Sequence, residues 1–288
     1  MVEKTMSPIL GLLQDLYSVY EAGGPDIRRD SPADCEIRSF SRPESVKTAF
    51  FQGMMAVESA ADHLEGLDLL VRGRDFAIAP WTCARGLVEA SAIATWLLDT
   101  KIGVKERVSR SLALRFTALQ EQEKMARTAG DQKMVAQAQE RIGGIEKIAA
   151  ELGYPILRDR KKRRIGVAQP KPILTELITN QFGAQNVYRI LSGVAHSNYA
   201  FLLRLAFVRE NTSRSRGVLV KRAIPIELQK GLATKSTEIF TRGAWFQTIQ
   251  FGYDAAEVAV ILEKRFDELN IKNSNTVRFW RTVVGGGT

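Results

Sequence analysis

The stretch VKTAFFQGMMAVESAADHLEGLDLLV, residues 46–71, indicates the fold class of this chain. Its apolar residues recur with the period of an amphipathic α-helix, and they do not alternate as they would in a strand. Pro43 stands where a helix can begin, after Ser41 and with Glu44 in the first turn. The stretch therefore predicts one long helix that ends at about Val71.

The same periodicity continues outside this stretch, whereas strict alternation is scarce. From residue 104 to about residue 152 the chain turns polar, which predicts a long helical hairpin with a break near Gly130. The remaining helices are expected over residues 10–20 and 76–99, from about Pro170 or Pro172, through the segment 186–205, and from about Glu227 to Leu269.

Two segments depart from the helical pattern. The polar stretch GGPDIRRDSPADCEIRSFSRP, residues 23–43, is typical of a loop or an arm, and the residues around Val218 and Val220 weakly predict a short pair of strands. We therefore expect one all-α domain over residues 1–288. It is an antiparallel helical bundle with an N-terminal helix and arm at 1–42 and the hairpin 104–152 appended.

Charge and cysteine content limit the classes of function. Lys and Arg number 41 against 32 Asp and Glu, a net charge of +9 at pH 7, which favours acidic partners such as nucleic acid or anionic lipid or is simply a soluble basic surface. Two distant cysteines support neither a disulfide framework nor a zinc site. Charged residues interrupt every long apolar run, so we expect no membrane span and take the cytoplasm as the default location. Walker A and Gly-x-Gly-x-x-Gly motifs are absent, so we expect no cofactor.

The segment NVYRILSGVAHSNYAFLLRLAF, residues 186–207, carries an unusual polar face in an apolar helix. Seven helical residues turn through about 700°, so Arg189 and His196 share one face, together with Ser192 and Tyr199. Along the axis they are about 10.5 Å apart, which places them poorly for holding one phosphate together. Two copies of the stripe across a two-fold axis would close that distance. A core histidine satisfied beside a buried arginine is the alternative.

The residues YRILSGVAHSN, 188–198, also resemble the HEPN superfamily, whose signature is an Arg followed after four to six residues by a His. This resemblance implies a dimeric helical protein of a toxin or defence system that cleaves RNA without a metal. It implies that His196 is the acid/base and Arg189 the phosphate clamp. Ile190 stands where active members usually carry a polar residue, so an RNA-binding relative without cleavage activity stays open. A neutralising or regulatory protein is a further expected partner.

Arg85 and Glu89 are spaced for an intrahelical ion pair on an apolar helix. The pair is either purely structural or orients Arg189 or His196 from a neighbouring helix. His63, with Glu58 and Asp62 nearby, lacks the spacing of a di-iron or zinc motif. We therefore predict no metal site and interpret His63 as a surface or helix-end histidine.

A basic run provides a candidate nucleic-acid surface. It consists of Arg158, Arg160, Lys161, Lys162, Arg163 and Arg164. Farther along the chain, Arg209, Arg214, Arg216, Lys221 and Arg222 could extend it. A solvated loop is the simpler interpretation. Two other functions stay open: a non-enzymatic adaptor that binds a protein through the hairpin 104–152, and a nucleotide pocket lined by Arg85, Glu89 and Arg189.

Overall fold

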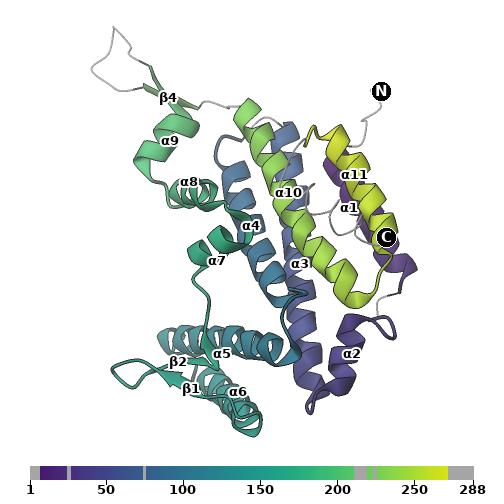
Figure 1. The fold of residues 1–288 in the computed structure, drawn as a ribbon. Coiled ribbons are helices and arrows are strands. Elements are labelled where there is room, and N and C mark those ends of the chain that lie inside the picture. The colour runs from purple at the N-terminus through teal and green to yellow at the C-terminus, as the bar shows by residue number, and fades with distance from the viewer. Residues whose placement is uncertain (1–6, 25–26, 74–75, 211–218, 223–225, 272–288) are drawn as a thin grey trace.

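A computed structural model describes residues 7–24, 27–73, 76–210, 219–222 and 226–271 (Figure 1). This part of the chain is predominantly helical, which confirms the predicted all-α class. The helices described are α1 (Pro8–Ala22), α2 (Pro32–Ser39), α3 (Pro43–Gly73), α4 (Ala79–Leu97), α5 (Val104–Ala129), α6 (Gln132–Glu151), α7 (Leu174–Phe182), α8 (Gln185–Ala195), α9 (Tyr199–Leu205), α10 (Ile226–Phe251) and α11 (Ala255–Glu268).

Two small antiparallel sheets interrupt the helices in the described residues. One has the order β1 (Ile156–Arg158), β2 (Arg164–Val167) and β3 (Gln169–Pro170). The other pairs β4 (Phe207–Glu210) with β5 (Leu219–Arg222), with Phe207 opposite Arg222. Val220 of the expected strand pair lies in β5, and Val218 falls outside the described residues. The basic run spans the end of β1, the turn that follows and the start of β2, because Arg158 ends β1 and Arg164 begins β2.

The core lies where α3, α4 and α10 pack against one another, in the middle of the molecule (Figure 1). α10 is buried on nearly every side, and Trp245 is only 2% exposed. A helix surrounded by protein needs no polar face, which explains why apolar residues are spread around α10. None of the described helices combines the length and the apolar character needed to cross a membrane.

The predicted hairpin is confirmed as α5 and α6. Gly130 ends α5 with a left-handed φ of 73°, a conformation that glycine adopts without steric cost. Asp131 then caps α6 by accepting a hydrogen bond from the backbone N–H of Met134. The hairpin extends sideways from the bundle and carries β1 and β2 alongside it (Figure 1).

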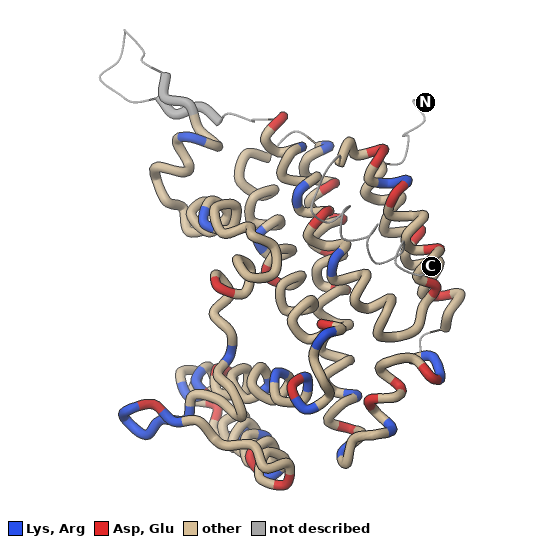
Figure 2. Tube along the Cα trace, in the orientation of Figure 1, with Lys and Arg blue, Asp and Glu red and all other residues tan. Residues whose placement is uncertain are grey.

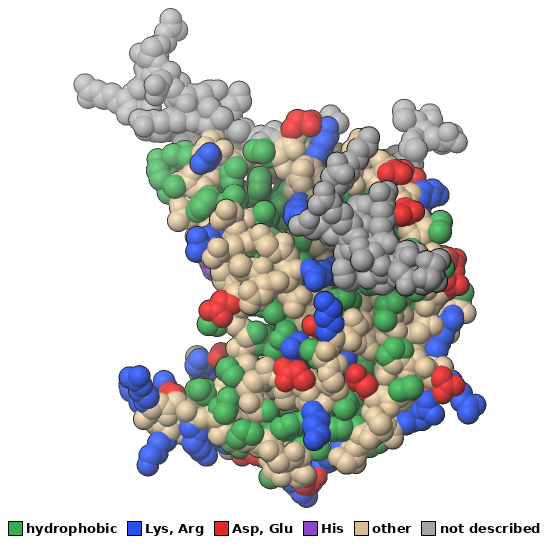
Figure 3. Space-filling view, viewed as in Figure 1, with side chains coloured by type: hydrophobic (Ala, Val, Ile, Leu, Met, Phe, Trp, Pro, Cys, Tyr) green, Lys and Arg blue, Asp and Glu red, His purple; other side chains and the backbone are tan. Residues whose placement is uncertain are grey.

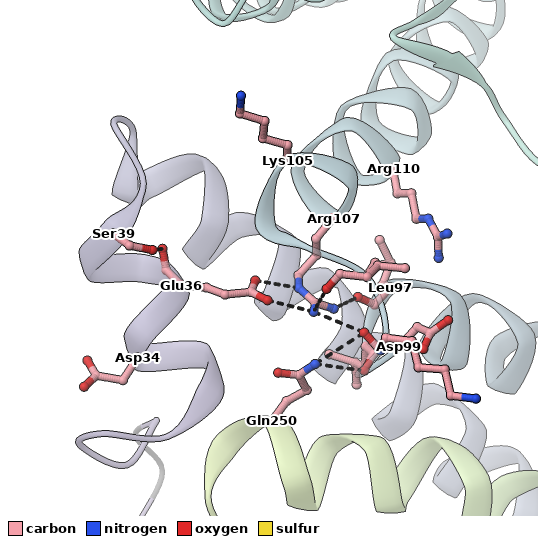
Figure 4. Close-up of polar contacts among 12 residues, drawn as sticks. Asp34, Glu36, Ser39, Leu97, Asp99, Lys105, Arg107, Arg110 and Gln250 are labelled. Atoms are coloured by element: carbon pink, nitrogen blue, oxygen red, sulfur yellow. Dashed lines mark hydrogen bonds and ion pairs between the residues drawn. The ribbon is translucent and has the colours of Figure 1, made fainter.

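Arg107 joins α5 to the bundle from a fully buried position (Figure 4). Its guanidinium donates to both carboxylate oxygens of Glu36 in α2, at 2.8 and 3.1 Å. It also donates to the backbone carbonyls of Leu97, the last residue of α4, and of Asp99 and Ile102, which follow α4. A buried arginine is tolerated only when its donors are satisfied, and here the carbonyls and the carboxylate satisfy them.

The expected boundaries are wrong in the N-terminal arm and in the last long helix. The expected arm contains α2, because Ser31 caps a helix whose first residue is Pro32. The last long helix is two helices, because Gly252 turns the chain with a φ of 76° and Asp254 caps α11. The first residues of the expected N-terminal segment, 1–6, and the C-terminal tail lie outside the described residues.

Candidate functional site

The helix that carries Arg189 ends earlier than the sequence pattern predicts. α8 stops at Ala195, His196 is its C-cap, and Ser197 has a left-handed φ of 54°. The N–H of Asn198 bonds to the carbonyl of Gly193 at 2.8 Å and that of Ser197 to the carbonyl of Val194 at 3.0 Å. This pair of bonds is the Schellman closure of a helix C-terminus.

The early end changes the predicted polar face. Arg189, Ser192 and His196 line one cleft of about 620 Å³ together with residues of α7 and α9. Tyr199 does not belong to this face, because it begins α9, is 72% exposed and does not line the cleft. The described surface is hollowed between α7–α9 and the β1–β2 hairpin (Figure 3). Arg189 and His196 are themselves exposed, so their face is open and not packed in the core.

Arg85 of α4 lies directly beside His196. Its Nη1 is 3.1 Å from Nε2 of His196, and because a guanidinium can only donate, the imidazole nitrogen accepts. The predicted ion pair is present, with Nε of Arg85 2.8 Å from Oε1 of Glu89. The hydroxyl of Tyr188 donates to the same carboxylate oxygen at 2.8 Å. The pair is thus linked to His196 through Arg85.

The electrostatics of this group keep Arg85 charged. Burial alone would lower the pKa of Arg85, but the hydrogen bond and charge of Glu89, and then Tyr188, raise it above its ordinary value. Burial, and then the bond to Glu89, raise the pKa of the Tyr188 hydroxyl. Glu89 is thus shared by two donors, while Arg85 keeps one nitrogen for His196 at the edge of the cleft.

Arg189 is the arginine that lines the cleft itself. Its side chain is exposed and makes no ion pair or hydrogen bond with any residue that the structure describes. It approaches the cleft from α8, whereas Arg85 approaches from α4. The cleft is therefore lined by the guanidinium of Arg189 and the imidazole of His196, and Arg85 contacts that imidazole from α4.

The basic run projects from the molecule at the β1–β2 turn, on the same side of the view as α8 (Figure 2). Asp159 is its one acid. It accepts from the N–H groups of Lys161 and Arg163 and from the guanidinium of Arg163. Although desolvation opposes the change, these bonds lower the pKa of Asp159. Arg164 pairs with Glu146 of α6.

The remaining members of the run bear on the nucleic-acid prediction. Arg158 donates to the carbonyl of Lys162, and the side chains of Arg160, Lys161 and Lys162 have no ion-pair partner in the described part of the chain. Of the expected extension, Arg209, Lys221 and Arg222 lie in β4 and β5. Arg214 and Arg216 are outside the described residues.

His63 is not at a helix end. It lies in the middle of α3, half-buried, where its ring packs over Gly86 and its carbonyl accepts from Sγ of Cys83 at 3.2 Å. A side chain at Gly86 would overlap the ring, since its Cβ would fall 2.5 Å from Nε2. No group of three or more metal-ligating side chains occurs among the described residues.

Several residues of the cleft were not predicted from the sequence. Tyr188 faces α4 because it lies three and six positions before the buried Leu191 and Val194, a spacing that could have identified it. Phe201 folds back over Gly193, where a Cβ would lie 2.3 Å from its ring. Thr175 comes from α7, and nothing local in the sequence indicates that it approaches α8.

The cleft has the chemistry of an oxyanion site. Arg189 in the cleft and Arg85 beside His196 are guanidinium groups that can hold phosphate oxygens, and an imidazole can take or give a proton. Comparisons of the chain with models of protein families, with curated proteins and with solved structures found no match.

Proposed function

We propose that this chain is a HEPN-like endoribonuclease that acts as a dimer in a toxin or defence context and needs no metal. The observation that carries the proposal is the 3.1 Å contact between Arg85 and His196 at the edge of an open cleft that Arg189 also lines. It brings a permanent cation to an imidazole, a group that can act as an acid or a base.

The proposed reaction uses the ribose of the substrate as nucleophile. Nε2 of His196 takes the proton of the 2′-hydroxyl, and the 2′-oxygen forms a bond to the adjacent phosphorus. The bond from phosphorus to the 5′-oxygen breaks, and that oxygen receives a proton from the imidazolium. The products are a 2′,3′-cyclic phosphate and a 5′-hydroxyl, so atoms and charge balance. General acid/base help of this kind is worth roughly 10²–10⁴ in rate.

The cations stabilise the phosphorane formed during this step. Arg85 is next to the imidazole, so substrate phosphate exchanges with Nε2 of His196 as its hydrogen-bond acceptor. Arg189 precedes His196 by about 10.5 Å along the axis of α8, so it would contact a different phosphate of the strand or the site of a second copy. A composite site across a two-fold axis would use both Arg85 and Arg189.

The basic hairpin supports RNA as the substrate. The β1–β2 turn, which carries Arg160, Lys161 and Lys162, lies on the same side of the view as α8 (Figure 2), and these cations would give a phosphate-tracking surface beyond the reaction site. Removing cations that contact phosphate lowers the salt dependence of binding by about 0.7 per contact for single strands. A triple alanine variant of these residues should therefore bind RNA more weakly and with a shallower salt slope.

Cleavage of mixed RNA in the presence of EDTA tests the proposal. We expect cleavage by the wild-type protein, and a loss of roughly 100-fold or more in His196→Ala, Arg189→Ala and Arg85→Ala. Arg204→Ala is the matched control, because Arg204 is an exposed cation of α9 that does not line the cleft. Circular dichroism establishes that each variant is folded. Absence of both cleavage and salt-sensitive RNA binding would refute the proposal.

A non-enzymatic adaptor is the second candidate, and one observation favours it. Met125 and Met134 flank the tip of the α5–α6 hairpin and are 70% and 51% exposed. Flexible exposed methionines are typical of surfaces that bind protein partners. Under this alternative, replacing both with Glu would abolish capture of a regulatory protein while RNA binding stayed absent.

A further inference from the structure

A smaller cavity of about 290 Å³ adjoins the Arg189–His196 cleft, and Thr175 lines both. We call it the α7 cavity. Its lining consists of Thr175, Glu176, Thr179, Asn180 and Gln185. Because they share Thr175, the two cavities are neighbours along α7 and α8, which lie next to each other in the fold (Figure 1), and together we call them the groove.

The two ends of this groove differ in charge. The cleft has the guanidinium of Arg189 and the imidazole of His196, whereas no cation lines the α7 cavity. That cavity offers hydroxyl, amide and carboxylate groups instead. A phosphate would be repelled by Glu176, while a neutral planar group with amino and ring-nitrogen atoms finds both acceptors and donors.

One face of α8 connects the two ends. Gln185 precedes Arg189 by four residues and His196 by eleven, so all three lie within about 40° around the helix. Gln185 is about 6 Å from Arg189 along the axis. This face of α8 therefore carries, in order, the amide of Gln185, the proposed phosphate-binding guanidinium of Arg189 and the proposed proton-transfer imidazole of His196.

The backbone turn between α7 and α8 brings the polar groups of the α7 cavity together, and several of their side chains are free to bind. Gly183 ends α7 with a φ of 61° and, with the buried Ala184, makes the short turn into α8. This turn places the end of α7 against Gln185. The side chains of Asn180, Gln185 and Glu176 make no hydrogen bond or ion pair within the described part of the chain.

We propose that the α7 cavity binds the nucleobase next to the phosphate held in the Arg189–His196 cleft, and that it selects a base with an exocyclic amino group. Glu176 accepts from that amino group, and the amides of Asn180 and Gln185 pair with the rest of the base edge. Uracil has no amino group and presents a carbonyl to the Glu176 carboxylate, so it is disfavoured. This inference rests on the proposed function and names its substrate preference.

The experiment measures binding of fluorescein-labelled 2′-O-methyl octanucleotides, which cannot be cleaved, by fluorescence anisotropy. The probes are oligo(A), oligo(C), oligo(U) and an abasic strand with the same phosphates. We expect oligo(A) or oligo(C) to bind roughly five-fold or more tighter than oligo(U) and the abasic strand, since one good base-edge contact gives that discrimination. Gln185→Met and Glu176→Gln should both remove the difference. Gln185→Met should leave abasic binding unchanged, whereas Glu176→Gln, which removes a negative charge, should leave it unchanged or tighten it.

Gln181→Met is the matched control, because Gln181 is a half-buried amide on α7 that does not line the α7 cavity. It should keep the wild-type discrimination. Equal binding of all four probes, or discrimination that survives Gln185→Met and Glu176→Gln, would overturn the inference and leave the proposed function standing. Absence of binding to every probe would overturn both.

Discussion

Replacing Arg107 with Met should destabilise the fold more than any change to an exposed arginine. Met keeps most of the aliphatic stem, so the substitution removes the guanidinium without opening a large cavity. It leaves Glu36 without its cation and removes the donor from three backbone carbonyls. Arg107 is fully buried and Glu36 is 19% exposed, so the lost pair is shielded from water.

The expected cost follows from this burial. Removing one partner of a buried ion pair costs about 3–5 kcal/mol. With a urea dependence of about 3 kcal/mol per molar, the unfolding midpoint should fall by roughly 1–1.7 M. Arg127→Met on the same helix is the control, because Arg127 is 56% exposed and pairs with Glu123 four residues earlier. That change should cost about 0.3–0.5 kcal/mol.

Urea denaturation followed by circular dichroism at 222 nm measures both variants. Glu36→Gln should cost less than Arg107→Met, since the guanidinium then keeps its three carbonyl acceptors. A midpoint for Arg107→Met within experimental error of Arg127→Met would refute the claim that this arginine joins α2, α4 and α5.

Three further predictions concern the cleft and the thiols. Mixing Arg189→Ala with His196→Ala subunits should restore about a quarter of wild-type cleavage if each site takes one residue from each copy. Half of the dimers would then be mixed, and each mixed dimer would hold one intact site of two. A mixture as inactive as its parents would place the whole site in one subunit. Ser197→Gly should raise the free energy of unfolding by about 0.5–1 kcal/mol by relieving a left-handed φ, measured by urea denaturation, whereas Ser197→Val should lower it. Burial, and then the negative charge of Asp62, raise the pKa of the Cys83 thiol. At pH 8 iodoacetamide should therefore label Cys83 slowly and the exposed Cys35 rapidly, which mass spectrometry of tryptic peptides would measure.

The long helices could be predicted because their signals are local. α3 has an apolar period over seven turns, and Gly130 interrupts a polar helical pattern at the one place where the α5–α6 turn occurs. The missed elements also have local signals that an apolar period obscures. Ser31 and Pro32 are the cap and first residue of α2, and Gly252 followed by Asp254 ends one helix and starts another.

The candidate site was only partly predictable for a different reason. The common face of Arg189 and His196 follows from spacing within one helix, and both line the cleft. The contact between Arg85 and His196 depends on how α4 packs against α8, which no local pattern specifies. Tyr199 was misplaced because Ser197 adopts a left-handed conformation that glycine usually provides, so the helix end had no visible marker.

The position of the cleft follows from the two sides of α4. One side packs against α3 and α10, where Gly86 lies against His63 of α3 and Ala94 lies against Gly243 of α10. The other carries Arg85 and Glu89, whose side chains keep 23% and 28% exposure under α7 and α8. Because water still reaches this pair, its attraction is moderate, and Arg85 is free to exchange acceptors when an anion enters. Arg107 makes the same kind of bond without any exposure and holds its partners permanently. Partial burial is therefore what makes Arg85, and not Arg107, a candidate ligand-binding arginine.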